Sequence, residues 1–348
     1  MTPLRNTISR RELLGRGVAA AGGVLLAGVP SLAEPPAAAA AADALPTRLL
    51  GKTKVPISAL TLGTAPCGQS KHVGAREIAD LTDVALNLGV TSIDTARAYD
   101  DAEEGVGRAL GGRRKEVFLA TKVWADTIAD AEKSFAESLR NLRTDYVDLV
   151  YFHGLGTRDV EAARGAEGVF TWLLRQKQLG KTRFVGISGH NLSDRFPAFI
   201  ATGEVDVVLM VLNFVDRYLY HFEDRVLPLA RRHGCGVVAM KVFGGVRGGF
   251  GAYAGPKAPP QLDEKLLPLA VRYALSLPGV TSVNIGVHDA EQVRQNVAMV
   301  RNFQPLSDAE QQSLAKLGRE LSSQWGPHFG PENAPVARAP AFEPIAYA

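Results

Sequence analysis

The sequence is poor in cysteine, in long apolar runs and in net charge, and each shortage excludes a class of protein. Cys67 and Cys235 are the only cysteines in 348 residues, so a disulfide framework, a four-cysteine metal site and an iron–sulfur cluster are excluded. An apolar run at residues 17–29 is too short to cross a bilayer, which requires about 20 residues. We therefore expect no stable membrane span.

The charge distribution also argues against a nucleic-acid partner. The formal net charge is +3 at pH 7, and residues 1–33 contribute all of it through four arginines and one glutamate. The rest of the chain is neutral and has no cluster of lysine and arginine, so it does not attract nucleic acid or an acidic membrane surface. With 46% hydrophobic and 22% charged residues, the composition is that of a globular protein.

The N-terminus has the pattern of an export signal. Paired arginines at Arg10 and Arg11 precede the weakly apolar run, and residues 31–33 form a small-x-small cleavage pattern. This combination predicts a twin-arginine (Tat) signal peptide over residues 1–33, export to the periplasm or another extracytoplasmic location, and the Tat export machinery as a partner. The Ala/Pro-rich residues 34–46 are then a linker. An uncleaved amphipathic tail with chance arginines is the alternative.

From residue 60 onward, short apolar runs alternate with segments of helical apolar spacing. The predicted strands cover residues 60–65, 92–96, 117–122, 147–152, 184–188, 205–212, 237–242 and 282–287. The predicted helices cover residues 76–88, 102–110, 129–142, 168–179, 222–232, 264–277 and 290–300. Such alternation requires a parallel sheet with crossover helices, and eight units favour a (β/α)8 TIM barrel over an open doubly wound sheet.

Both ends of the barrel domain have patterns of their own. Residues 47–60 contain a Gly-Lys-Thr turn between extended segments, which predicts an N-terminal β-hairpin that closes the bottom of the barrel. We assign residues 47–325 to the barrel and the Pro/Ala-rich residues 326–348 to an irregular C-terminal extension. Cys67 and Cys235 fall at opposite rims, farther apart than the about 7 Å that a disulfide permits between Cα atoms, so both thiols are predicted to be free.

Three glycine motifs do not mark nucleotide sites. The segment 234–239 loosely matches a dinucleotide fingerprint, but it leads from a helix into a strand, which is the reverse of the required order. The Gly-Lys-Thr triplets at 51–53 and 180–182 lack the upstream glycine of a phosphate loop. A nucleotide must therefore be held by the loops of the barrel.

Four polar residues leave three adjacent predicted strands at the end where barrels carry their active sites. Asp94 lies near the end of the second strand and Tyr99 follows it, Lys122 ends the third, and His153 follows the fourth. Because the carboxyl ends of parallel strands meet at one mouth, we expect the four side chains to converge.

The chemistry of these four residues fits proton transfer to a carbonyl oxygen. A free tyrosine has a pKa of about 10, and the Lys122 ammonium would lower the pKa of Tyr99 by favouring the phenolate. Asp94 would keep the recessed Lys122 protonated, and His153 would donate a hydrogen bond to a carbonyl oxygen. No side chain donates hydride, so a reduction requires a nicotinamide cofactor.

These residues lie in motifs that resemble the aldo-keto reductase family over about residues 47–303. The motifs are IDTARAYD at 93–100, EEGVGRAL at 103–110, ATK at 120–122, DLVYFH at 148–153, GIS at 186–188 and GV at 286–287. The resemblance implies the barrel fold and NAD(P)-linked interconversion of an alcohol and a carbonyl, either an aldehyde, a ketone or a keto-sugar. It also implies that Asp94, Tyr99, Lys122 and His153 are catalytic, with Tyr99 as general acid in reduction and general base in oxidation.

The resemblance implies cofactor positions as well, with departures. Ser188 matches the serine that holds the carboxamide, but Gly189 replaces the neighbouring asparagine, and Leu209 replaces the glutamine expected on the sixth strand. Met240, followed by Lys241, replaces the aromatic ring that stacks on nicotinamide. Further implied contacts are Gly63, Thr64, Asp94, Gly244, Gly286, Val287, His288, Gln292 and Asn296.

The choice of dinucleotide depends on His288. The family often places an arginine or lysine there for the 2′-phosphate, and a neutral histidine attracts phosphate less than arginine does. NADP and NAD both stay open, with NADPH slightly favoured. On the substrate side, Trp124, just past Lys122, is expected to form a wall of the pocket.

Two other functions are alternatives to this interpretation. An aspartate and a histidine at strand ends would suit a metallohydrolase barrel, but two ligands are too few, so no metal site is predicted. By analogy with ion-channel β-subunits of the same family, the chain could instead be a cofactor-loaded binding or redox-sensing subunit with little turnover. Steady-state turnover against a panel of carbonyl compounds would separate an enzyme from such a subunit.

Overall fold

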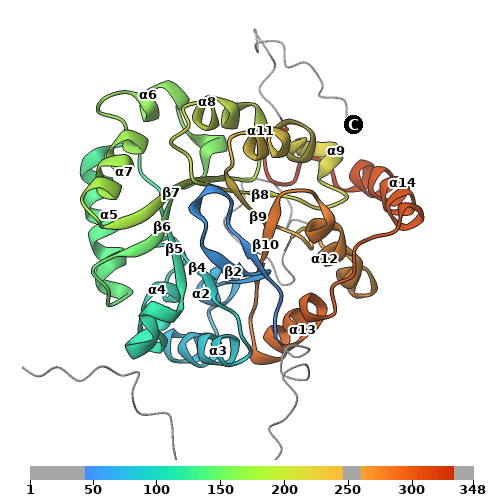
Figure 1. Ribbon diagram of the computed structural model, residues 1–348, viewed down its shortest axis with the longest axis horizontal. Coiled ribbons are helices and arrows are strands. Elements are labelled where there is room, and N and C mark those ends of the chain that lie inside the picture. The colour runs from blue at the N-terminus through green and yellow to red at the C-terminus, as the bar shows by residue number, and fades with distance from the viewer. Residues whose placement is uncertain (1–43, 246–259, 333–348) are drawn as a thin grey trace, which may run out of the picture. The chain divides into compact units, whose positions relative to one another are not determined.

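Eight parallel strands close into a barrel, and helices surround it (Figure 1). The computed structural model describes residues 44–245 and 260–332, so the predicted signal peptide, most of the predicted linker and the end of the predicted C-terminal extension lie outside these residues. The strands are β3 (Leu60–Gly63), β4 (Ser92–Asp94), β5 (Phe118–Val123), β6 (Val147–Phe152), β7 (Thr182–Gly189), β8 (Val207–Val211), β9 (Gly236–Met240) and β10 (Val280–Gly286). Each strand pairs with the next in the chain, and β10 pairs with β3 to close the ring. The predicted TIM barrel is confirmed.

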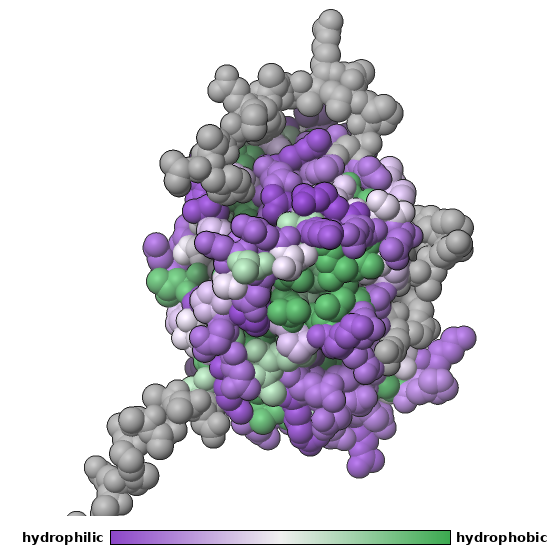
Figure 2. Space-filling view, turned by 90° about the vertical axis from the view of Figure 1, so that its right-hand side faces the viewer, coloured by the Kyte–Doolittle hydropathy of each residue, from purple (hydrophilic) through white to green (hydrophobic). Residues whose placement is uncertain are grey.

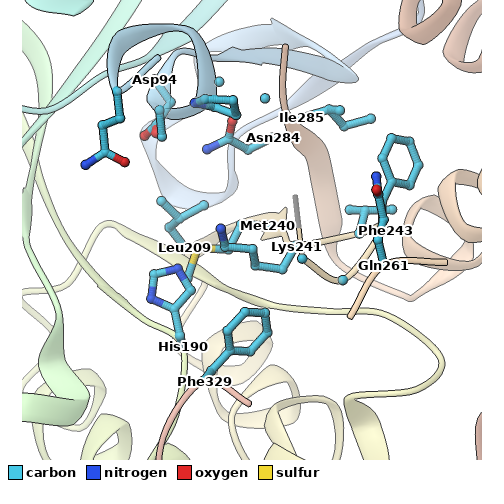
Figure 3. A pocket seen from close by; sticks show the side chains of 18 of the residues that line it. Asp94, His190, Leu209, Met240, Lys241, Phe243, Gln261, Asn284, Ile285 and Phe329 are labelled. Carbon is cyan, nitrogen blue, oxygen red and sulfur yellow. The ribbon is translucent and has the colours of Figure 1, made fainter. Parts of the chain in front are cut away.

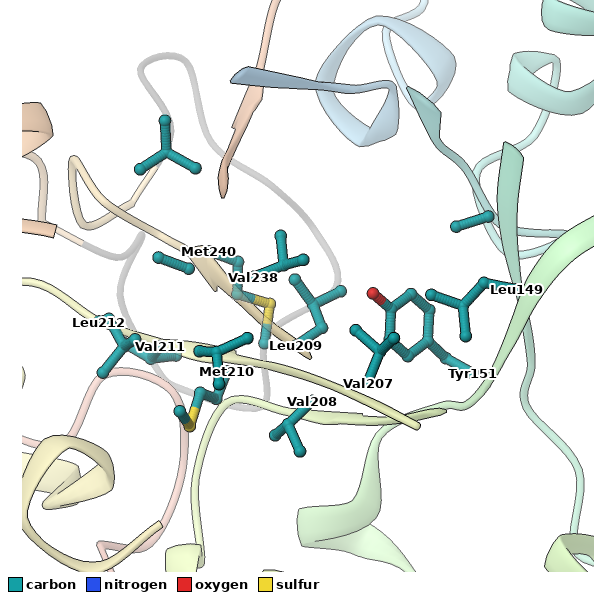
Figure 4. Packing of buried hydrophobic residues seen from close by; sticks show 14 of the residues in the cluster. Leu149, Tyr151, Val207, Val208, Leu209, Met210, Val211, Leu212, Val238 and Met240 are labelled. Atoms are coloured by element: carbon teal, nitrogen blue, oxygen red, sulfur yellow. The ribbon is translucent and has the colours of Figure 1, made fainter. Parts of the chain in front are cut away.

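The barrel strands are covered on both faces. All five residues of β8, Val-Val-Leu-Met-Val, are buried, because one face of a barrel strand points to the interior and the other packs under helices. Figure 4 shows Leu149, Tyr151, Val207, Leu209 and Val238 in the shared apolar core. This packed core fixes the places where the strands end.

Helices connect the strands on the outside of the barrel. They are α2 (Ala65–Gly68), α3 (Ala75–Asn87), α4 (Ala102–Leu110), α5 (Ile128–Asn141), α6 (Val160–Arg164), α7 (Val169–Gln178), α8 (Phe196–Ile200), α9 (Arg217–Tyr220), α10 (Phe222–Arg225), α11 (Leu227–Arg232), α12 (Leu267–Ser276), α13 (Ala290–Arg301) and α14 (Asp308–Trp325). Side-chain caps at Thr127 and Asp289, each worth about 1 kcal/mol, begin α5 and α13. Within the described part of the chain, no helix combines the length and the apolar character needed to cross a membrane.

A hairpin covers the end of the barrel opposite the carboxyl ends of the strands. As predicted, β1 (Thr47–Leu49) and β2 (Pro56–Ser58) pair in antiparallel fashion. In the turn between them, the Lys52 amide donates a hydrogen bond of 2.6 Å to the Gly234 carbonyl, just before β9. Gly51 has a φ of +51°, and a Cβ there would lie 2.3 Å from the first backbone nitrogen of β9, so only glycine fits this contact.

Two predicted helices are interrupted near a proline. Residues 222–232 divide into α10 and α11 at Val226, and Pro228 lies in the first turn of α11, where its missing N–H is tolerated. Residues 264–277 begin with a 3₁₀ turn, and α12 starts only afterwards, with Pro268 in its first turn. The first predicted helix is therefore divided in two, and the second starts later than the apolar spacing indicates.

The helix α14 lies outside the predicted alternation of strands and helices. Its apolar positions, among them Leu314 and Leu317, recur at helical spacing, and Ser307 and Glu310 form a capping box at its start. Figure 2 shows the face that carries α12 to α14, where apolar residues gather in a zone framed by hydrophilic ones. After α14 the chain continues through residues 326–332 without a helix or strand.

Both cysteines are buried and free, as predicted. Burial raises the pKa of the Cys67 thiol to about 12 and the pKa of the Cys235 thiol to about 11. Neither thiolate is populated at neutral pH, so neither cysteine is an activated nucleophile.

Candidate active site

A cavity of about 1150 Å³ lies at the carboxyl ends of the barrel strands. Figure 3 shows side chains from opposite sides of the barrel around it, among them Asp94 from β4, Leu209 from β8 and Asn284 from β10. Loops contribute further residues, because His190 follows β7 and Lys241 follows β9. The cavity thus collects residues that are far apart in the sequence at the end where barrels carry their active sites.

Lys122 and Asp94 form a buried ion pair beneath this cavity. Lys122 Nζ lies 2.5 Å from Asp94 Oδ1 and donates a second hydrogen bond of 2.8 Å to the Thr95 carbonyl. The two side chains are 2% and 5% exposed. Burial lowers the pKa of Lys122, and the negative charge of Asp94 opposes that shift. The expected contact between Lys122 and Asp94 is therefore present.

Tyr99 lies against Lys122, but the pKa of its hydroxyl moves in the direction opposite to the one predicted. Lys122 Nζ is 4.6 Å from the centroid of the Tyr99 ring, so the cation faces the π-system. Burial raises the pKa of Tyr99 well above its ordinary value, and the negative charge of Asp94 raises it further. The cost of burying a phenolate beside a carboxylate exceeds the attraction of Lys122. Tyr99 is therefore a protonated phenol at neutral pH.

His153 is a neutral imidazole packed against two aromatic rings. Its ring centroid lies 6.1 Å from that of Tyr99 and 5.1 Å from that of Trp124, both edge to face. Burial, together with the positive charges of Lys122 and Arg158, lowers the pKa of His153 well below 6.5. Its Nδ1 atom is buried without a hydrogen-bond partner among the described residues. A neutral imidazole beside Tyr99 can donate one hydrogen bond to a substrate oxygen.

Trp124 lines the cavity next to His153. Its side chain is half exposed, and the Arg158 guanidinium lies 5.0 Å from the centroid of its ring. Arg158 is held in turn by an ion pair of 2.5 Å with Asp126. This stack keeps the indole at the rim of the cavity, where a substrate next to His153 would meet it.

The residues expected at the cofactor divide into two groups. Those that line the cavity are Gly63, Asp94, Met240, Lys241, Gly244, Gly286, His288, Gln292 and Asn296. Those that are buried without lining it are Thr64, Ser188, Gly189 and Val287. At Gly244, whose φ is +81°, the contact that requires glycine is the Trp325 ring of α14, 2.6 Å from where a Cβ would stand. Packing within the protein therefore suffices to explain that glycine.

Several buried polar atoms of the residues expected at the active site lack a partner among the described residues, which is the state expected where a ligand completes the hydrogen bonds. They are Asp94 Oδ2, His153 Nδ1, Ser188 Oγ and His288 Nε2. At the start of α13, Gln292 Oε1 accepts a hydrogen bond of 2.8 Å from the His288 amide, which fixes this turn beside the cavity. The lining runs from Tyr99 to Asn296, and with these atoms it fits an extended dinucleotide.

The C-terminal segment, residues 326–332, closes one side of the cavity, and the sequence patterns did not predict this. Its lining residues are Phe329, Gly330 and Pro331. The Phe329 amide donates a hydrogen bond of 2.6 Å to the Tyr220 hydroxyl, and His328 Nε2 lies 3.3 Å from Asp216 Oδ1. The available signal was the aromatic pair His328-Phe329, which interrupts a Pro/Ala-rich tail.

His190 is a second lining residue to which the sequence analysis assigned no role. It follows β7 as His153 follows β6, so the rule that active-site residues leave strand ends could have found it. Its ring centroid lies 5.6 Å from that of Phe329. Burial, and then the positive charge of Lys241, lowers the pKa of His190 well below 6.5, so its ring is neutral.

Several known proteins are similar to this chain in both sequence and fold. Residues 59–261 match the aldo/keto reductase family. L-galactose dehydrogenase of Arabidopsis thaliana is 29% identical over 307 residues, which cover 78% of this chain and 92% of that protein. Aldo-keto reductase AKR11C1 from Bacillus halodurans, in its holo form, has a TM-score of 0.64 at 26% identity, with 78% of this chain and 96% of that one covered. An aldo/keto reductase from Klebsiella pneumoniae in complex with NADP and acetate has a TM-score of 0.61 at 25% identity, with 78% and 95% covered.

The fold and the site define a class of (β/α)8 oxidoreductases with a tyrosine, a histidine and a buried lysine–aspartate pair at the barrel mouth. This chain belongs to the aldo/keto reductase family and is an enzyme of that family, as its motifs had indicated.

Proposed function

We propose that this protein is an NAD(P)-dependent oxidoreductase that interconverts an aldehyde, ketone or keto-sugar and the corresponding alcohol. The observation that carries the proposal is the placement of Tyr99, His153 and the Lys122–Asp94 pair at one cavity. A protonated phenol beside a neutral imidazole meets the needs of a carbonyl oxygen that gains a proton.

Each of the four residues has a distinct role in this proposal. Tyr99 is the general acid in reduction and the general base in oxidation, and its raised pKa, caused by burial, keeps it protonated until the proton is transferred. The Lys122 cation against its ring stabilises the phenolate that forms. His153 donates a hydrogen bond that holds the substrate oxygen in reach, and Asp94 keeps Lys122 charged.

A bound NADPH or NADH would supply the hydride that no side chain can donate. Ser188, with its buried and unpartnered Oγ, would hold the carboxamide. His288, Gln292 and Asn296 would hold the adenosine end beside α13. NADP is favoured because the similar Klebsiella protein forms a complex with it, and His288 in the place of an arginine is compatible with NAD.

Turnover by the purified protein tests this proposal. Reduction of aldehydes, ketones and keto-sugars with NADPH and NADH is measured for the wild type, for Tyr99→Phe and for Tyr146→Phe. We expect Tyr99→Phe to bind nucleotide normally but to lose about 10²–10⁴ in kcat, the usual value of a positioned acid. Tyr146 packs on Arg114 and does not line the cavity, so Tyr146→Phe should keep the wild-type rate.

Two results would contradict the proposal in different ways. An unchanged rate in Tyr99→Phe would remove Tyr99 from proton transfer. A single hydride transfer by the wild type, followed by retention of the nucleotide without further turnover, would indicate the binding or redox-sensing subunit instead.

We also propose that the protein is exported in folded form through the Tat pathway to the periplasm. The support is the pair Arg10 and Arg11 and the cleavage pattern at residues 31–33. Soluble NAD(P)H is not replenished outside the cytoplasm, so an exported enzyme would have to retain and recycle its nucleotide.

A further inference from the structure

Arg158 joins three loops at the carboxyl end of the barrel, although its own side chain does not line the cavity. It follows the 3₁₀ turn Leu155–Thr157, and its side chain is 4% exposed. Its Nη1 forms an ion pair of 2.5 Å with Asp126, in the loop after β5. Its carbonyl oxygen accepts a hydrogen bond of 2.6 Å from Arg195, in the loop after β7. The loops after β5, β6 and β7 all contribute residues to the cavity, so Arg158 links the segments that form one part of its wall.

Two further contacts connect the Arg158 guanidinium to residues that do line the cavity. Its central carbon lies 5.0 Å from the centroid of the Trp124 ring, which is the distance of a cation–π contact. Its Nε donates a hydrogen bond of 3.5 Å to the His153 carbonyl oxygen. Because the Trp124 and His153 rings themselves pack edge to face, with their centroids 5.1 Å apart, one guanidinium contacts both members of a packed pair. Arg158 is thus placed to fix the indole relative to the imidazole.

The stability of the fold does not by itself account for Arg158. Its Nη2 is buried without a hydrogen-bond partner among the described residues, and the side chain of its partner Asp126 is 74% exposed. A buried guanidinium loses its hydration, and an ion pair with a well-hydrated carboxylate offsets only part of that loss, so an apolar side chain of similar volume would fill the site at a lower cost. Proteins keep such unfavourable features mainly at functional sites. The position of Arg158 beside Trp124 and His153 therefore indicates a role in the reaction.

The positive charge of Arg158 also acts on the His153 ring. Burial is the largest cause that lowers the pKa of His153, and the positive charges of Lys122 and Arg158 lower it further. A cation at this place opposes protonation of the imidazole and so favours the neutral ring. The charged and titratable groups around His153 are Tyr99, Lys122, Arg158 and His190, with Asp94 paired to Lys122 and Asp126 paired to Arg158.

We propose that Arg158 is a positioning residue of the active site, which fixes Trp124 as a wall of the cavity and holds His153 as the oriented, uncharged imidazole that donates a hydrogen bond to the substrate oxygen. The inference rests on the proposed carbonyl chemistry, because that chemistry places the substrate oxygen at His153. Arg158 acts only through the Trp124 and His153 rings and contacts neither the substrate nor the nucleotide. Such support matters because a small displacement of the reacting groups slows the chemical step.

Steady-state kinetics of Arg158 variants measure the effect on turnover, with NADPH and the carbonyl compound that the wild type reduces fastest. We expect Arg158→Met to lower kcat/KM for the carbonyl compound by about 10- to 100-fold, the loss that a small misplacement of reacting groups causes. The KM of the nucleotide should not change. Arg164→Met is the matched control, because Arg164 also pairs with a carboxylate, that of Glu161, and contacts a ring, that of Phe199, but neither Arg164 nor Phe199 lines the cavity. This control should keep the wild-type kcat/KM.

Titration of His153 by NMR provides a readout that a merely structural role would not give. With isotope-labelled histidine, and with the signal assigned by its loss in His153→Gln, the wild-type ring should be neutral at pH 6.5 and titrate only at lower pH. Arg158→Met should raise the pKa of His153, because one of the cations that oppose its protonation is gone. Arg158→Lys should keep the pKa of His153 low but should still lose kcat/KM, since an ammonium keeps the charge without the planar fork that reaches both Trp124 and Asp126.

The outcomes separate this inference from the proposed function. Wild-type kcat/KM in Arg158→Met would overturn the inference. So would an equal rise in the pKa of His153 in the Met and Lys variants, the result expected if Arg158 only excludes water. If Arg158→Met does not fold, Asp126→Ala, at an exposed side chain, removes the anchor of the guanidinium, and an unchanged kcat/KM in that variant would overturn the inference. Absence of wild-type turnover with the whole carbonyl panel, together with the expected difference between the Met and Lys variants, would refute only the proposed function.

Discussion

At the scale of single residues, the site depends on the buried Lys122 ammonium, which the fold tolerates only because the Asp94 carboxylate pairs with it. Lys122 is 2% exposed and contacts both Asp94 and the Thr95 carbonyl. Removing an ammonium from water costs several kcal/mol, and the carboxylate returns most of that cost only while both partners are present. The main effect of the pair is therefore to fix a cation next to Tyr99, and its net contribution to stability is small.

Breaking the pair should destabilise the protein strongly. Lys122→Met leaves the Asp94 carboxylate buried without its partner, so we expect the free energy of unfolding to fall by about 3–5 kcal/mol. Urea denaturation of the purified protein measures this. Adding Asp94→Asn to the same variant should recover part of the loss, and the exposed Lys133→Met should stay within about 0.5 kcal/mol of the wild type. Unchanged stability in Lys122→Met would contradict this account of the pair.

The convergence of the four polar residues could be predicted from the sequence, whereas the pKa of Tyr99 could not. Each residue lies at the end of a strand or just after one, and the carboxyl ends of the strands must lie at the barrel mouth, so order along the chain was sufficient to bring Asp94, Tyr99, Lys122 and His153 together. The direction of the pKa shift depends on how deeply the phenol is buried and on which face of its ring meets the cation. Neither quantity is encoded in spacing.

At the scale of elements, the strands were predictable and the last segments of the chain were not. A barrel strand is buried on both faces, so its apolar run stands out against the helices around it, as in Val207–Val211. Helix α14 and the C-terminal segment come after the last strand, where the alternation that organised the prediction has ended. The segment is held by single contacts, such as that of the Phe329 amide with Tyr220, and these leave no periodic pattern.

Removal of the Phe329 ring tests the contribution of the C-terminal segment. The ring is only 5% exposed and lines the cavity, so we expect Phe329→Ala to widen the cavity and to raise the KM of the carbonyl substrate roughly tenfold, which is about 1.4 kcal/mol, while kcat falls less. Steady-state kinetics provide the measurement. Leu179→Ala, which removes a side chain that is 69% exposed, is the control. An unaltered KM in Phe329→Ala would show that the substrate does not reach this wall.

At the scale of the whole molecule, the chain combines an enzyme barrel with a predicted export signal. Folding and cofactor binding would then precede export, because the Tat route carries folded proteins. This order would deliver a nucleotide to a compartment that does not replenish it.

Substitution of the paired arginines tests the proposed export through the Tat pathway. The double variant Arg10→Lys/Arg11→Lys should accumulate in the cytoplasm, while the wild type is recovered from the periplasmic fraction, as measured by fractionation and immunoblotting. Denaturing the wild-type protein from that fraction should release a nicotinamide nucleotide. Periplasmic recovery of the double variant would speak against the Tat signal, and absence of nucleotide would speak against transport with the cofactor bound.

The hairpin of β1 and β2 limits the routes by which ligands can reach the active site. The hairpin covers one end of the barrel, and side chains fill the interior between the ends. A nucleotide and a carbonyl substrate would therefore both enter through the cavity at the other end. Trp124 is half exposed and lines the cavity together with the buried Phe329, while Ser188 is buried without lining the cavity. Under the proposed function, in which Ser188 holds the carboxamide, the nucleotide would bind before the carbonyl substrate and leave after it.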